Sequence, residues 1–340
     1  RSTSLMSSKR PRPKRVALLG DAFVDVQVGG VKSLPSWGSD VDCESVRLLP
    51  GGSCGNTARQ LGSLGGDEMD AYFFTCVGDD EMGRHYVRTL SQEGAISQPE
   101  LTLHALKGKP QSCCVILSGP TDRAMCSCYA SVHGVAIALF EEVLFEKDAN
   151  DDPWALVHLG GYFNCVGLHD GATLRALEAL KLRGAMLSMD PQHDCSGKWT
   201  GEGGHLAQLL PLLDVFMPNE AELTGLTGAT SLEEGLAQLA ADHPSLLIVN
   251  TLGADGLRAA RGTQRWAVPA LPVAKFVDAT GAGDACAAGF LTQLLRDPQD
   301  VESALRCGAA AGALCVSVAG ACERPLAPAQ LAAALAAGSV

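Results

Sequence analysis

At 340 residues, with 46% of them hydrophobic, the chain is long enough to bury a large core and fits one α/β domain with or without an appendage. The formal charge of −12 argues against nucleic-acid binding by the protein as a whole. The sequence has no run of about 18 apolar residues, so we expect no membrane span.

Charge and cysteine usage bear on where the protein works. Residues 1–15 carry six Lys or Arg and no acid. Such a basic, Ser/Pro-containing segment buries little apolar surface, so we predict a disordered arm over residues 1–14. The 13 cysteines form no Cys-x-x-Cys pair and their number is odd, which favours reduced thiols over a zinc site. We therefore expect a cytoplasmic protein, with a nuclear address in the basic arm as the alternative.

From residue 15 onward, short apolar runs alternate with helical patterns. The runs resemble buried parallel strands, and the segments between them have helical spacing. The expected strands are 15–20, 71–77, 154–159, 185–189, 215–217 and 246–249. The expected helices are 56–64, 83–92, 171–182, 231–241, 284–295, 301–318 and 327–337. This alternation predicts a doubly wound, mostly parallel α/β sheet within one domain over residues 15–340.

Two segments, about 26–50 and 111–132, break this alternation. The first contains short alternating stretches between turn residues, and the second has the pattern of a β-hairpin. Four short strands would form a small sheet over one edge of the main domain, and we expect this sheet to act as a lid that excludes water. A surface excursion without a catalytic role is the alternative. Arg123, at the hairpin tip, either reaches over the site or lies in a solvated turn. Exposed edges of such a lid would favour a homodimer.

The most informative segment is 278–284, Asp-Ala-Thr-Gly-Ala-Gly-Asp. Gly281 and Gly283 permit a tight turn into a helix, and the N–H groups of Gly281, Ala282 and Gly283 would then face one anion. Asp284 would repel a resident anion. It fits a phosphoryl group in transit, with the carboxylate taking a proton from the attacking hydroxyl. On its own, an acid in the first turn of a helix is also an ordinary helix start.

Two further features stand where an acceptor could bind. Gly51 and Gly52 precede a helix with Asn56 near its start; adjacent glycines let backbone N–H groups approach a ligand, and the amide both donates and accepts. Asp25 follows the first strand, near the mouth of the sheet, and a carboxylate can accept two vicinal O–H groups. In isolation, the glycine–asparagine segment is ordinary helix capping.

Two later segments also follow expected strands of the main sheet. Asn219 and Glu222 open a helix after the strand at 215–217, either as a functional pair or as plain helix-start residues. The segment with Thr251, Gly253, Asp255 and Gly256 follows the strand at 246–249. The Walker A pattern is absent.

Taken in order over roughly residues 15–330, these four motifs resemble the signatures of the ribokinase-like (PfkB) carbohydrate kinases. The resemblance implies a ribokinase-like fold and an ATP-dependent kinase that phosphorylates a hydroxymethyl group of a sugar. It implies Asp284 as the general base and the Gly281–Gly283 turn as the anion hole. Ala279 departs from the usual Thr, which leaves that turn intact.

The resemblance also implies roles for the remaining candidate residues. It implies that the acceptor is bound by Asp25, Gly51, Gly52 and Asn56. It implies that the nucleotide is bound by Asn219, Glu222, Thr251, Gly253, Asp255 and Gly256. Glu222 would hold Mg²⁺ through water, which suits an ion that keeps several waters. Some members also use a monovalent cation such as K⁺, here near Asp278.

The acceptor itself stays open. Phe23 stands where ribokinase-type members have Asn, and no Lys lies between the glycines and Asn56, so ribose is disfavoured. Hexoses and 2-keto-3-deoxygluconate fit, and a nucleoside kinase of the adenosine or pseudouridine type is the main alternative. Its base pocket would draw on Phe23, Trp37, Tyr129 and Tyr162. A binding protein without chemistry is less favoured because the base and the anion turn are both present.

Overall fold

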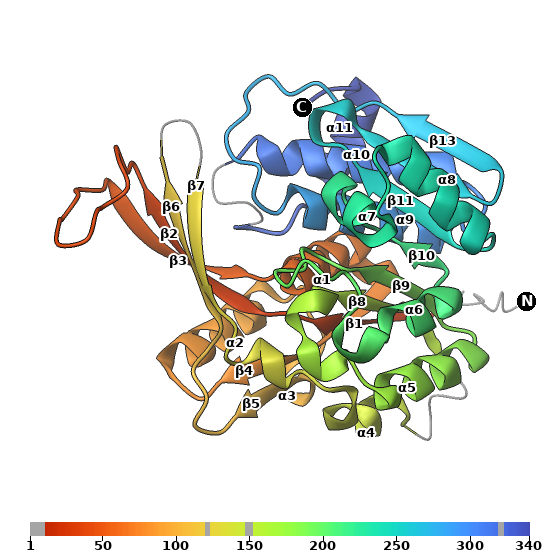
Figure 1. Ribbon diagram of the computed structural model, residues 1–340, viewed down its shortest axis with the longest axis horizontal. Helices are drawn as coiled ribbons and strands as arrows, with labels where there is room; N and C mark the ends of the chain where they lie inside the picture. The colour runs from red at the N-terminus through yellow and green to blue at the C-terminus, as the bar shows by residue number, and fades with distance from the viewer. Residues whose placement is uncertain (1–10, 120–122, 147–151, 319–322) are drawn as a thin grey trace, which may run out of the picture.

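The computed structural model describes residues 11–119, 123–146, 152–318 and 323–340. A large sheet forms the body, and a separate small sheet projects from it (Figure 1). Most of the arm predicted over residues 1–14 lies outside the described residues, and strand β1 begins at Lys14. In the described part of the chain, no helix is both long and apolar enough to cross a membrane.

Among the described residues, nine strands form the large sheet, in the order β13-β12-β11-β10-β9-β8-β1-β4-β5. Their bounds are β1 (Lys14–Gly20), β4 (Met69–Gly78), β5 (Leu103–Leu106), β8 (Trp154–Gly160), β9 (Met186–Asp190), β10 (Val215–Phe216), β11 (Leu247–Thr251), β12 (Leu257–Arg261) and β13 (Gln264–Val268). The pairs from β5 to β11 are parallel, whereas β12 and β13 form an antiparallel hairpin at one edge. The sheet is therefore mostly parallel, as predicted, although the sequence did not indicate β5 or the β12–β13 hairpin.

The sheet is doubly wound about β1. Strand β1 pairs with β4 on one side and with β8 on the other, so the chain moves outward in both directions. Such a reversal opens a crevice at the carboxyl ends of the central strands, where α/β folds bind ligands. Here those ends are Gly20 on β1 and Gly160 on β8, and the candidate site lies beside them.

Helices cover both faces of the large sheet. Successive residues of β1 alternate between the faces: Ala17 and Leu19 join one buried cluster, and Val16 and Leu18 join the other. Helices α5, α7 and α8 pack on the first face, and α1, α2, α9 and α10 pack on the second. The bounds of the helices are α1 (Ser53–Gly65), α2 (Glu81–Glu93), α3 (Pro99–Thr102), α4 (Glu141–Leu144), α5 (Gly171–Leu182), α6 (Leu206–Leu209), α7 (Glu220–Thr227), α8 (Leu232–Asp242), α9 (Ala282–Arg296), α10 (Val301–Val316) and α11 (Pro328–Ala337).

The small sheet comes from the two segments that broke the strand–helix alternation. In the described residues its order is β3-β2-β6-β7, with bounds β2 (Phe23–Gly29), β3 (Ser45–Gly51), β6 (Cys113–Ser118) and β7 (Arg123–Cys128). Strand β2 continues almost directly from β1, so the small sheet stands beside the carboxyl end of the central strand (Figure 1). Because side chains alternate along a strand, Phe23, Asp25 and Gln27 share one face of β2.

Candidate active site

Helix α9 begins in a tight turn that leaves backbone donors exposed. Gly281 has a φ of 73°, in the left-handed region that favours glycine. The N–H of Ala282 donates to the carbonyl of Ala279 at 3.3 Å, whereas Gly283 and Asp284 lie in the first turn, where N–H groups lack intrahelical acceptors. A Cβ at Gly283 would meet no heavy atom within 4 Å. The turn therefore presents donors and the positive end of the helix dipole to open space, which suits an anion.

Asp284 points from this turn toward helix α1. Its two carboxylate oxygens accept hydrogen bonds from Ser53 Oγ and Asn56 Nδ2, both at 2.9 Å. The side chain is buried, and this burial raises the pKa of Asp284 to about 7, although the hydrogen bonds from Asn56 and Ser53 oppose the rise. The structure thus places Asp284 beside Asn56, one of the predicted acceptor residues. A carboxylate with a pKa near neutrality can take up a proton under working conditions.

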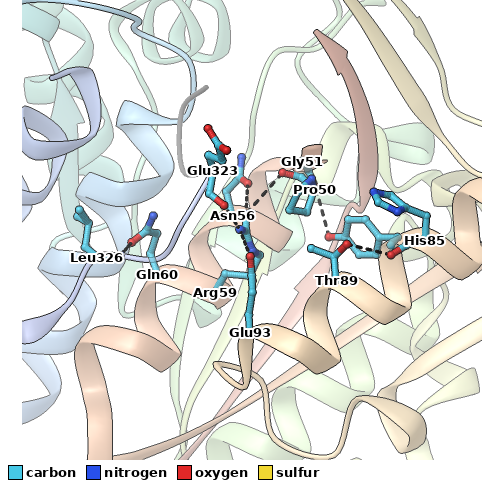
Figure 2. A network of polar contacts seen from close by, with 11 residues as sticks. Pro50, Gly51, Asn56, Arg59, Gln60, His85, Thr89, Glu93, Glu323 and Leu326 are labelled. Carbon is cyan, nitrogen blue, oxygen red and sulfur yellow. Dashed lines mark hydrogen bonds and ion pairs between the residues drawn. The ribbon is translucent and has the colours of Figure 1, made fainter. Parts of the chain in front are cut away.

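A buried arginine, which sequence analysis missed, holds Asn56 in this orientation. Arg59 is 1% exposed, and its Nη1 donates to Asn56 Oδ1 at 3.4 Å (Figure 2). Its Nε and Nη2 donate to the two carboxylate oxygens of Glu93, and Nη2 also donates to the carbonyl of Glu323 at 3.1 Å. With Oδ1 occupied by the guanidinium, the Asn56 Nδ2 faces Asp284. The signal available in the sequence was the spacing of three residues, which puts Arg59 and Asn56 on one helix face.

Asp25 lies against the glycine turn that precedes helix α1. A Cβ at Gly51 would come within 2.4 Å of the Asp25 Cγ, so only glycine leaves room for this carboxylate. Gly52, with a φ of 91°, makes the turn into the helix. Burial raises the pKa of Asp25 to about 7, the charge of Asp21 adds to the rise, and Arg59 opposes it. The predicted acceptor residues Asp25, Gly51, Gly52 and Asn56 therefore occupy one corner of the site.

The neighbouring Asp21 is used by the fold itself. Its Oδ1 accepts from the backbone N–H of Cys54 and its Oδ2 from Asn164 Nδ2, both at 2.8 Å. These bonds join the end of β1, the start of α1 and the loop after β8. Burial raises the pKa of Asp21 to about 6, and the hydrogen bonds from Asn164 and Cys54 limit that rise.

Asn219 and Glu222 form a reciprocal capping box at the start of α7. The Glu222 N–H donates to Asn219 Oδ1 at 2.9 Å, while the Glu222 carboxylate accepts from the backbone N–H and from Nδ2 of Asn219, at 2.9 and 2.6 Å. Both side chains thus serve the helix start in this state. Burial raises the pKa of Glu222 to about 7, and the backbone hydrogen bond from Asn219 opposes the rise.

Asp190, at the carboxyl end of β9, connects the two halves of the site electrostatically. It is buried, and its pKa is raised well above the usual value by burial first and then by the charges of Glu222 and Asp284. Among the described residues, no group of three His, Cys, Asp or Glu side chains is arranged to hold a metal ion alone. A metal here would share its coordination with phosphates and water, as Mg²⁺ commonly does.

A mostly apolar cavity of about 500 Å³ lies on the other side of the α9 turn. It is lined by five of the predicted residues, Thr251, Gly253, Gly256, Ala282 and Gly283, and by small side chains of α9 and α10. A Cβ at Gly253 would meet no heavy atom within 4 Å. Asn219 adjoins this region through a parallel bridge to Thr251, whereas Asp255 is exposed and does not line the cavity. The cavity is large enough for a nucleoside moiety, because ligand pockets commonly measure about 300–1,000 Å³.

Comparison with known proteins identifies the family. A family model described as "pfkB family carbohydrate kinase" matches residues 14–328. The chain belongs to this family. It is therefore a carbohydrate kinase, a phosphotransferase with an alcohol group as acceptor. A fructokinase of Klebsiella pneumoniae is 30% identical over 290 residues, which cover 82% of this chain and 84% of that protein.

Solved structures agree on the fold. Arabidopsis thaliana ribokinase, complexed with ribose and ATP, has a TM-score of 0.74 at 22% identity and covers 96% of this chain and 99% of its own. A putative ribokinase II from E. coli, in complex with ATP and Mg²⁺, has a TM-score of 0.77 at 18% identity, with coverage of 94% and 98%. The large, mostly parallel sheet with a small accessory sheet is thus the ribokinase-like fold that the motifs implied.

A second cavity, of about 690 Å³, lies on the acceptor side. Asn164 lines it and also binds Asp21, while Tyr129 lines it and packs edge-on against Phe23 with ring centroids 5.5 Å apart. The aromatic pocket expected for a nucleoside is only partly formed. Trp37 is fully exposed, and Tyr162 is buried behind the cavity wall.

Proposed function

We propose that this pfkB-family protein transfers the γ-phosphate of ATP to a hydroxymethyl group of a carbohydrate. The observation that supports this most strongly is the position of two consecutive residues. Gly283 lines the apolar cavity, and Asp284 hydrogen-bonds to Asn56 on the acceptor side. The α9 turn therefore lies between a nucleotide-sized cavity and a carboxylate-lined corner, where a phosphoryl group would cross.

Each residue has a role in this transfer. Asp25, with Gly51, Gly52 and Asn56, would bind acceptor hydroxyls and orient the hydroxymethyl group. Asp284 would take the hydroxyl proton onto its carboxylate, with an expected contribution of about 10²–10⁴-fold. The Gly281–Gly283 turn would stabilise charge on the transferring group, where a lost donor typically costs about 10²–10³-fold.

The residues present fit ATP and Mg²⁺. Gly253 and Gly283 leave open space where a larger residue would intrude, as a phosphate cradle requires. Asp190 and Glu222 are buried acids, and the charge of Glu222 helps to raise the pKa of Asp190; a divalent cation would relieve this repulsion. Bound Mg²⁺ would neutralise phosphate charge during transfer. Thr251, Gly253 and Gly256 would contact the nucleotide, Asn219 and Glu222 would order the water around the metal, and Asp255 would contribute from the rim of the site.

Two acceptor classes have support. A fructokinase among the relatives makes hexoses the first choice. The cavity of about 690 Å³ beside Asp21 offers room for a second ring, which favours a nucleoside as the other candidate.

A panel of hexoses, pentoses, 2-keto-3-deoxygluconate and nucleosides, with ADP release as the readout, tests the proposal. We expect one acceptor class to raise ATP turnover and Asp284→Asn to abolish that rise; equal ATP turnover with and without every acceptor would refute it.

Three further features belong to this proposal. The monovalent cation would bind near Asp278, and replacing K⁺ with tetramethylammonium would then lower turnover.

A homodimer would form through the small sheet, whose outward face includes Val46 and Leu48, 61% and 43% exposed. Val46→Glu should then shift the mass measured by light scattering from dimer to monomer. A cytoplasmic location would appear in cell fractionation.

A further inference from the structure

The small sheet contacts the signature loop through polar side chains. Gln27 Nε2 on β2 donates to Asp278 Oδ2 at 3.3 Å, and Arg123 Nη1 on β7 donates to Thr280 Oγ1 at 3.1 Å. The same nitrogen of Arg123 lies 3.8 Å from Asp278 Oδ1. Thr280 immediately precedes Gly281, the first residue of the anion turn. The small sheet therefore places a guanidinium at the entrance to that turn.

The side chains around the α9 turn are mostly acidic, and Arg123 supplies a positive charge there. Asp25, Asp190 and Asp284 are acids on or near the path of transfer, and the phosphates of ATP would add further negative charge. Arg59 is already paired with Glu93 inside the protein. The sequence has neither a Walker A lysine nor a lysine between Gly52 and Asn56. Among the described residues, Arg123 is the one Lys or Arg whose side chain forms an ion pair with the segment 278–284.

We propose that Arg123 contacts the transferring phosphoryl group and neutralises the charge that develops there when the small sheet closes over the acceptor. This inference rests on the proposed function and adds a catalytic residue to it. The Arg123 side chain is 36% exposed, and its contacts with Thr280 and Asp278 place the guanidinium where it would meet a phosphate oxygen entering the turn. A guanidinium also offers two parallel N–H donors to a phosphate, which an ammonium group does not. Because the cation comes from the small sheet, the site is complete only in the closed state, which limits phosphoryl transfer to water.

The test compares Arg123→Gln and Arg123→Lys with a control, Arg84→Gln, whose arginine lies exposed on α2 and pairs with Glu81. Steady-state kinetics would use the best acceptor from the panel. Calorimetry would measure binding of ADP and of the non-hydrolysable analogue AMP-PNP. We expect Arg123→Gln to lower kcat by about 10²–10³-fold, as for removal of an oriented donor at a developing charge. We also expect it to remove any preference for AMP-PNP over ADP and to raise the ratio of ADP formed to acceptor phosphorylated. Arg123→Lys should restore part of each effect, and Arg84→Gln should change none.

The outcomes separate this inference from the proposed function. If the wild-type protein phosphorylates an acceptor while Arg123→Gln keeps kcat within threefold and keeps the wild-type AMP-PNP to ADP affinity ratio, the role of Arg123 is refuted and the kinase assignment stands. A higher acceptor KM alone, with unchanged kcat and nucleotide preference, would also refute it, because Arg123 would then only help to bind the acceptor. If the wild-type protein binds neither nucleotide, both proposals fail together.

Discussion

Replacing Asp284 with Asn should make the ligand-free protein more stable, in addition to inactivating it. Burial raises the pKa of Asp284 from 3.8 to about 7, so the folded state binds this proton more tightly than the unfolded chain does. At about 1.4 kcal/mol per pKa unit, the charged carboxylate lowers the free energy of unfolding by up to about 4 kcal/mol. This destabilisation is absent below the unfolded pKa, grows as the pH rises, and is complete above about pH 7.

Asn fits the same position without a charge. Its carbonyl oxygen can accept from Asn56 Nδ2, and its amide can donate to Ser53 Oγ, so both neighbours keep a partner. We expect Asp284→Asn to exceed the wild type in stability by about 1–2 kcal/mol at pH 5 and by up to about 4 kcal/mol at pH 8.

Urea unfolding at both pH values, followed by circular dichroism without ligands, measures the difference. Asp242→Asn, at the exposed end of α8, is the control and should show no such trend. A variant no more stable than the wild type at pH 8, or a difference independent of pH, would show that Asp284 is not a strained buried acid.

Four other predictions address separate parts of the site. As the pH rises through about 7, kcat/KM should increase because the free enzyme's Asp284 must lose its proton; a flat profile between pH 5.5 and 8.5 would contradict this. Arg59→Met should cost about 3–5 kcal/mol in urea unfolding, since it leaves the carboxylate of Glu93, whose side chain is only 16% exposed, without its partner. Gly51→Ala should displace Asp25 and raise the acceptor KM at least about tenfold with little change in ATP affinity, checked by kinetics and calorimetry. Gly312→Val should fill the nucleotide cavity and weaken ATP binding, whereas acceptor binding in calorimetry should stay unchanged.

Local patterns predicted the parts of the fold that depend on local chemistry. The apolar run before Gly20 and the helical pattern from Gly171 to Leu182 each follow from spacing along the chain, and the structure has both elements. The glycines before α9 require a turn whatever surrounds them, since Gly281 adopts a positive φ. The family resemblance of 278–284 then indicated which neighbours this turn needs.

Features that depend on distant pairing could not be predicted. The parallel pairing of β2 with β6 joins residues about 90 positions apart, and nothing in either strand encodes the partner. The burial of Arg59 depends on Glu93 and on the carbonyl of Glu323, which lie far away in the sequence. An arginine on a helix is usually exposed, so its sequence context concealed its role. Trp37, by contrast, was expected in a pocket and is exposed, because aromatic character alone does not locate a side chain.

Single-turnover phosphorylation of the preferred acceptor, measured against pH for the wild type and for Asp284→Asn, tests whether Asp284 is the base that takes the hydroxyl proton. We expect a wild-type rate that rises through about pH 7, and a variant about 10²–10⁴-fold slower whose rate has lost that rise while it binds ATP normally. A variant that transfers phosphate within tenfold of the wild-type rate, with the same pH profile, would contradict it.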